Sequence, residues 1–63
     1  MKVKISNMPE YAWKHQYIVY SIVDNKNWFY GAYDEVSKAL CAMNFIGGSI
    51  ADVKEVERGG DNA

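Results

Sequence analysis

The clearest pattern in the chain is a run of apolar residues from Tyr17 to Val23, almost all of them β-branched or aromatic. Such a run predicts a β-strand. Both of its faces are largely apolar, so we expect a central strand covered on both sides. The polar tetrad at 24–27 favours a four-residue turn, and 28–33 reads as the return strand of a hairpin. Gly31 inside that strand indicates a bulge or a close approach of a helix.

A helix is predicted directly after the hairpin. Asp34 is a suitable N-cap, because its carboxylate can accept hydrogen bonds from the first free amides of a helix. Apolar residues then recur at spacings of three and four and form one stripe: Val36, Ala39, Leu40 and Met43. Gly47 and Gly48 end the helix, with one glycine in the left-handed cap position.

The two ends of the chain give weaker patterns. Residues 2–5 alternate between polar and apolar and predict a short strand, while Pro9 marks a turn at 6–10. The stretch 11–16 is either a loop or the lead into the next strand. Residues 49–58 fit a strand or a helix, and we favour the strand because a hairpin with one helix is marginal without a further strand. Residues 59–63 are expected to be a disordered tail.

These elements predict a single α+β domain over 1–58, with an antiparallel sheet of three or four strands and one helix packed on one face. The order is ββαβ, with a possible short strand before it. The expected core lies between the sheet and the helix and consists of Ile18, Tyr20, Ile22, Val36, Leu40 and Met43. Because both faces of 17–23 are apolar, the assignment of strand faces is open to reversal.

The small size of the chain favours stabilisation by association with another chain. A chain of 63 residues supplies only a small core, and Cys41 is its only cysteine, so it cannot form an internal disulfide. Nine aromatic residues exceed what one helix and a small sheet can enclose, and exposed aromatic surface marks interfaces. We expect the interface to include Tyr17, Trp28, Tyr30 and Trp13.

Catalytic and metal chemistry are not favoured. His15 lies in a polar stretch with no carboxylate at a fixed spacing, and nothing local activates Cys41. Adjacent carboxylates at Asp34 and Glu35 are explained by helix capping. One Cys and one His make a zinc site improbable. The sequence therefore predicts a protein that is not an enzyme and that needs no metal and no cofactor.

Charge also restricts the class of partner. The formal net charge is −1, which gives no strong field toward nucleic acid or an anionic membrane. Acidic residues prevail after residue 51 and lysines prevail before residue 15; solvated charges that discourage edge pairing explain this better than a basic partner does. No apolar run follows the start, so we expect no signal peptide, no membrane segment and a cytoplasmic location.

The unit formed by Trp28 to Asp34, a helix, Gly47-Gly48 and a closing strand resembles small uncharacterised proteins of bacteriophages and prophages of Gram-positive bacteria. The likeness covers roughly residues 17–57. It implies a cytoplasmic accessory protein, made during infection, that binds a host protein such as a defence enzyme. No site residues follow from it.

The sequence thus favours a non-enzymatic interaction module that is homodimeric, binds a larger host protein, or does both. The alternative is a single-strand nucleic-acid binder that stacks bases on aromatic side chains of the sheet. That alternative is less favoured, because 17–33 offers only Lys26 for phosphates.

Overall fold

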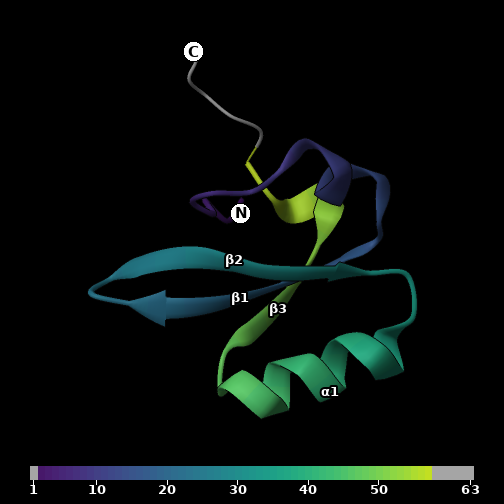
Figure 1. Ribbon diagram of the computed structural model, residues 1–63. Helices are drawn as coiled ribbons and strands as arrows, with labels where there is room; N and C mark the ends of the chain where they lie inside the picture. Colours follow the sequence, from purple (N-terminus) through teal and green to yellow (C-terminus); the bar gives the residue numbers. More distant parts are fainter. Residues whose placement is uncertain (1, 58–63) are drawn as a thin grey trace.

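The computed structural model describes residues 2–57, so the predicted tail at 59–63 lies outside the described residues. The fold is α+β with the predicted order ββαβ, and this prediction is confirmed (Figure 1). The elements are the 3-10 helix η1 (Glu10–Lys14), β1 (Tyr17–Val23), β2 (Lys26–Tyr33), α1 (Val36–Ile46), β3 (Ser49–Asp52) and the 3-10 helix η2 (Val53–Glu55). β1 is central in an antiparallel sheet of order β2-β1-β3.

The hairpin is tighter than predicted. Only Asp24 and Asn25 form the turn, and both have positive φ values of 53° and 65°. This geometry belongs to the two-residue turn that matches the twist of the strands, and Asp and Asn tolerate it well. The expected four-residue turn is therefore wrong, because Lys26 pairs with Val23 and already belongs to β2.

A bulge interrupts β2 beside the predicted glycine. Val19 pairs with Gly31 and Tyr20 pairs with Phe29, so Tyr30 is the extra residue. The close approach at Gly31 comes from a ring rather than from the helix. A Cβ at Gly31 would lie 2.7 Å from Oη of Tyr33, which shows that the Tyr33 side chain covers the glycine.

Each face of the sheet has its own cover (Figure 1). Ile18 is fully buried with Ala12 and Val56, in a cluster contributed by the N-terminal segment and the region of η2. The neighbouring Val19 points to the opposite face, because side chains alternate along a strand, and α1 packs on that face. The predicted placement of Ile18 against the helix is thus wrong, and the strand faces are reversed.

Three more residues of the predicted core are exposed. Ile22 is near the turn end of the hairpin, which projects beyond the helix, and it is 60% exposed (Figure 1). Val36 and Leu40 are 47% and 40% exposed. The buried or half-buried face of α1 consists of Ala39, Ala42, Met43 and Ile46. This stripe is rotated from the predicted one, because the small side chain of Ala39 allows α1 to approach the sheet closely. Met43 is half-buried on α1, as predicted for the core. Tyr20 is also half-buried, but it shares the face of Ile18 on β1, so its predicted placement against the helix is wrong.

The two ends of α1 differ in how they are capped. The residue before the helix is Glu35, and no side chain caps the first amides, so the predicted N-cap role of Asp34 is wrong. At the other end Gly47 has a φ of 66°, which confirms the left-handed cap. The amide of Gly48 donates to the carbonyl of Met43 at 3.0 Å, as in a Schellman motif.

The N-terminal segment replaces the predicted strand at 2–5 with two isolated bridges. Val3 pairs in parallel with Val56, and its amide donates to the carbonyl of Glu55 at 2.6 Å. Ser6 pairs in parallel with Trp28, where the amide of Phe29 donates to the carbonyl of Ser6 at 3.0 Å. The segment therefore connects the region of η2 to the outer edge of β2.

The region after α1 contains both structures that its pattern allowed. The favoured strand is present over Ser49–Asp52. Apolar residues in 49–58 also recur at a spacing of three, which allowed a helix, and this spacing corresponds to the single turn of η2. Asp52 caps that turn, because its carboxylate accepts from the amide of Lys54 at 2.9 Å. The ambiguous stretch at 11–16 is mostly η1.

Candidate functional site

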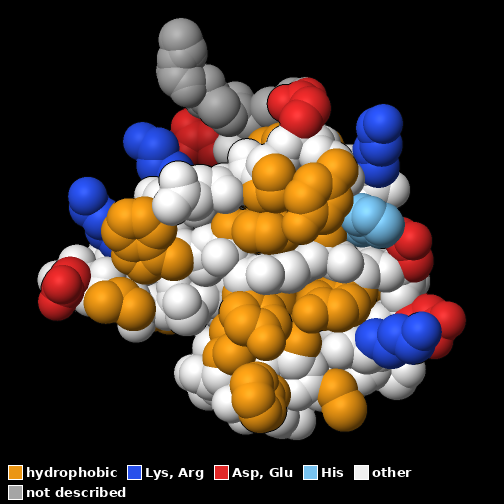
Figure 2. Space-filling view, in the orientation of Figure 1, with side chains coloured by type: hydrophobic (Ala, Val, Ile, Leu, Met, Phe, Trp, Pro, Cys, Tyr) orange, Lys and Arg blue, Asp and Glu red, His pale blue; other side chains and the backbone are white. Residues whose placement is uncertain are grey.

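No aromatic ring of this chain is fully buried. Tyr11, Tyr30 and Phe45 are exposed, and the other six are half-buried: Trp13, Tyr17, Tyr20, Trp28, Phe29 and Tyr33. The exposed fraction reaches 83% at Phe45. Hydrophobic side chains form several groups on the face shown in Figure 2, separated by backbone and by side chains that are neither hydrophobic nor charged. The predicted excess of aromatic surface is therefore present on the outside of this single chain.

The four predicted interface residues do not form one patch. Trp13 packs against the buried cluster around Ile18, so part of its surface belongs to the core. Tyr17 is the first residue of β1 and pairs with Tyr33, whereas Trp28 pairs with Ser21, four positions further along β1. That offset corresponds to about 13 Å along the strand. Tyr30 is the bulge residue of β2 and is 46% exposed.

Trp28 lines an open hollow at the turn end of the hairpin. Val23, Asp24 and Lys26 form the rest of its wall, and the hollow measures about 450 Å³. Val23 pairs directly with Lys26, and Trp28 lies two residues beyond Lys26 on the same strand. Side chains two apart on a strand share one face, so Lys26 and Trp28 point to the same side of the sheet. Their Cα atoms are about 7 Å apart. This hollow is largely apolar, apart from its two charged groups.

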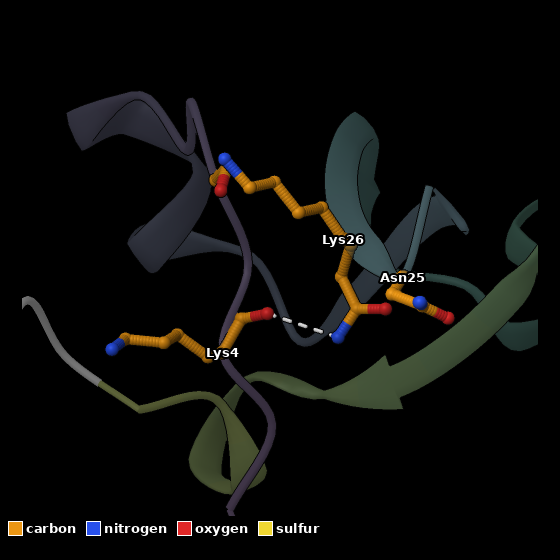
Figure 3. A pocket seen from close by; sticks show the side chains of 5 residues that line it. Lys4, Asn25 and Lys26 are labelled. Carbon is orange, nitrogen blue, oxygen red and sulfur yellow. Dashed lines mark hydrogen bonds between the residues drawn. The ribbon is translucent and has the colours of Figure 1, made fainter. Parts of the chain in front are cut away.

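A second, more polar hollow of about 350 Å³ adjoins the first (Figure 3). Its lining comes from the N-terminal segment and from the hairpin turn: Lys4, Ser6, Asn25, Lys26 and Asn27. The side-chain amide of Asn27 donates to the carbonyl of Lys4 at 3.0 Å and thereby fixes one wall. In Figure 3 the Lys26 side chain extends toward the N-terminal segment. Lys26 belongs to both hollows and joins them into one bipartite site.

Local sequence explains the shape of this site. The tight turn at Asp24 and Asn25 brings Lys26 into the first strand position, opposite Val23. The amide of Ser6 donates to the carbonyl of Asn27 at 2.7 Å, which holds Lys4 beside the hairpin. The sequence pattern missed that Lys4 and Lys26 line one hollow, because the hydrogen bond that holds Lys4 there joins residues 23 positions apart.

A second arrangement that the sequence missed joins His15 to Asp34. Nδ1 of His15 lies 3.1 Å from Oδ2 of Asp34, and the amide of Gln16 donates to Oδ1 of the same carboxylate at 3.3 Å. The Tyr11 ring contacts the edge of the imidazole at a centroid distance of 6.3 Å. The sequence offers no carboxylate at a fixed spacing from His15, and the fold supplies one from 19 positions away.

An imidazole held by a carboxylate can act as a general base when a substrate or nucleophile lies within hydrogen-bond reach. The Asp34 carboxylate is 67% exposed, and neither hollow at the hairpin end includes this pair. Cys41, the only thiol of the sequence, is free and exposed on α1. The pair joins the residue that follows η1 to the segment that precedes α1.

Comparisons with known proteins add no further constraint. No protein-family model, curated protein or solved structure matches this chain. Within residues 2–57 no three metal-binding side chains converge on one point. The longest helix in that range is α1, with 11 residues, and none of the helices there could cross a bilayer.

Proposed function

We propose that this chain is a non-enzymatic protein-interaction module. The observation that carries the proposal is that none of the nine aromatic side chains is buried, although the chain has a formed core. Large hydrophobic side chains are exposed on several elements at once: Tyr11, Ile22, Val23, Tyr30, Val36, Leu40 and Phe45. Exposed aromatic and aliphatic surface of this extent supports a role in binding other proteins.

The first partner in this proposal is a second copy of the chain, paired through the outer edge of β2. Ser6 covers that edge at Trp28, and no described strand pairs with it beyond Phe29. Residues 28–33 carry no charge, although charged side chains are a common protection of exposed edges. The ring of Tyr11 packs on Phe29 at 6.3 Å, beside the exposed Tyr30, and supplies apolar surface along the edge. Antiparallel pairing of two such edges would form a six-stranded sheet.

The resemblance to small phage proteins extends the proposal to a second partner, a larger protein of a bacterial host whose site the module blocks. Steric blocking requires no chemistry from the module itself. It needs aromatic anchors that fill a pocket and charges that fix the register, and both are exposed here.

The nucleic-acid alternative has less support. RNA-binding sheets stack bases on an open face, whereas here α1 covers one face and the N-terminal segment covers the other (Figure 1). Trp28 and Phe29 are also adjacent on β2 and point to opposite faces.

Sedimentation equilibrium from micromolar to millimolar concentration tests the homodimer. We expect a reversible dimer, and we expect Tyr30→Ser to weaken it at least tenfold while leaving the far-ultraviolet circular dichroism spectrum unchanged. Lys38→Ser is the matched control, because Lys38 is exposed on α1 away from the β2 edge. A monomer at millimolar concentration, or equal dimerisation by the Tyr30 and Lys38 variants, would remove the β2 edge from the proposal.

A further inference from the structure

We infer that the bipartite hollow at the hairpin end binds an extended, acidic segment of a partner protein, with an apolar side chain seated against Trp28 and a carboxylate at Lys26. This inference rests on the proposed function, because it specifies the chemistry of a protein partner. It concerns a different surface from the β2 edge, so the two can fail separately.

The apolar half of the site is large enough to seat a bulky side chain. Its 450 Å³ lies in the lower part of the range for small-ligand pockets, and its wall combines the Trp28 ring with Val23, which is 52% exposed. An aromatic ring beside an aliphatic side chain suits a leucine, isoleucine or phenylalanine anchor. Trp is also the residue type that most often dominates binding energy at protein interfaces.

The polar half supplies positive charge that has no ionic partner. Among residues 2–57 no carboxylate lies within ion-pair distance of Lys4 or Lys26. Asp24 is the one acidic residue of the lining. In Figure 3 the Lys4 side chain extends away from Lys26, so Lys26 is the cation that a bound carboxylate meets. The hydroxyl of Ser6 and the amide of Asn25 add neutral polar groups that can bond a carboxylate.

Spacing selects an extended ligand. Lys26 and Trp28 are two residues apart on one strand face, so their Cα atoms are about 7 Å apart. An extended peptide repeats its side chains on one side at the same interval. A segment with a large apolar residue and a glutamate or aspartate two positions away therefore meets both halves of the site together.

Single-stranded nucleic acid fits the same hollow less well. Such binders track successive phosphates with a row of cations, and this site offers two lysines and one carboxylate in its lining. Lys2 is turned elsewhere, since its ammonium donates to the carbonyl of Lys54 at 3.2 Å. The aliphatic wall at Val23 also favours a side chain over a base.

The test is a titration of the ¹⁵N-labelled chain with four probes, monitored by the chemical shifts of its amides. Three of the probes are peptides of equal length. The first is a peptide in which leucine and glutamate lie two positions apart. The second replaces glutamate by lysine, the third replaces leucine by serine, and the fourth is oligothymidylate. We expect the first probe to shift the amides of 4–6 and 23–28 and the Trp28 indole, saturably below millimolar concentration.

Variants of the protein separate charge from shape. Lys26→Glu is expected to weaken the first peptide at least fivefold, whereas Lys38→Glu, an equal charge change on α1, leaves it within twofold. Asp24→Asn is expected to strengthen it about twofold, because asparagine keeps the turn conformation and removes the repelling charge. The dispersion of the amide spectrum reports whether each variant is folded.

Four results would overturn the inference. These are the absence of saturable shifts with the leucine–glutamate peptide, equal affinity for the lysine peptide, shifts that map to another surface, and tighter binding of oligothymidylate. The last result would assign the hollow to nucleic acid. A monomer in sedimentation together with a positive titration would instead reject only the homodimer.

Discussion

The two glycines after α1 offer a direct test of how the fold is built, because each is required for a different reason. Gly47 has a φ of 66° and no atom within 4 Å of the place where a Cβ would stand. Gly48 lacks the left-handed conformation, but a Cβ there would collide with the carbonyl oxygen of Tyr20. It would also lie 2.9 Å from Cδ1 of Ile46 and 3.1 Å from the carbonyl carbon of Tyr20.

Gly48→Ala should therefore be the more damaging change. The end of the Ile46 side chain can rotate away, but Tyr20 belongs to the central strand and pairs with Ser49, the first residue of β3. Overpacking costs about 1–3 kcal/mol, and we expect the upper value of about 3 kcal/mol because the obstacle is backbone. A chain of 63 residues has a free energy of unfolding of roughly 3–9 kcal/mol, so this loss is a third of it or more.

Gly47→Ala is the matched control. It strains only the backbone, at about 1 kcal/mol, and Gly47→Asn should cost less because asparagine tolerates positive φ. Urea unfolding followed by tryptophan fluorescence measures both free energies. The reasoning fails if Gly48→Ala is no less stable than Gly47→Ala, or if asparagine is accepted better at 48 than at 47.

Three further changes test the core, the surface and the His15 contact. Ile18→Ala is expected to cost about 3 kcal/mol and to lower Tm by more than about 12 °C in a thermal melt, and a shift under about 4 °C would show that Ile18 is not central to the core. Phe45→Ser should change the free energy of unfolding of the monomer by less than about 0.5 kcal/mol in urea, since the ring is 83% exposed; a larger loss would mean that the ring is covered. Asp34→Asn with His15→Ala, in a double-mutant cycle, should give a coupling energy below about 1 kcal/mol, because the pair is exposed; a stronger coupling would show that solvent does not screen the pair.

Local patterns were enough to predict the hairpin, the helix and the cap at Gly47. Each depends on residues close together in sequence: a β-branched run, a stripe of period 3.6, and a glycine able to adopt positive φ. The turn was predicted too long because Lys26 and Asn27 are polar. Two residues with positive φ already suffice to reverse the chain, so these two polar residues join the strand.

The face of the strand that meets the helix depended on longer-range information. Both sides of β1 are apolar, and the cover of the Ile18 side comes from the N-terminal segment, whose bridges reach residues 22 and 53 positions away. The rotation of α1 has a similar origin. Hydrophobicity alone favoured Val36 and Leu40, whereas close packing favours the small side chain of Ala39.

The position of the candidate site depends on contacts that the sequence pattern does not reveal. The aromatic excess follows from composition, and the exposure of Tyr30 agrees with it. Trp13 is partly committed to the core, and the role of Lys4 beside Trp28 depends on the bridge at Ser6. Asp34 shows the same limit, because helix capping and a contact with His15 compete for one carboxylate, and only the fold decides between them.

The bridge between Val3 and Val56 also sets an order of events during synthesis on the ribosome. Val3 leaves the exit tunnel early, but its partner is made more than fifty residues later. The hairpin can form before Val56 is made, while the face of the sheet that carries Ile18 is still exposed to solvent. The nascent chain therefore exposes the hydrophobic surface around Ile18 until the region of η2 has been synthesised, and chaperones can bind that surface in the interval.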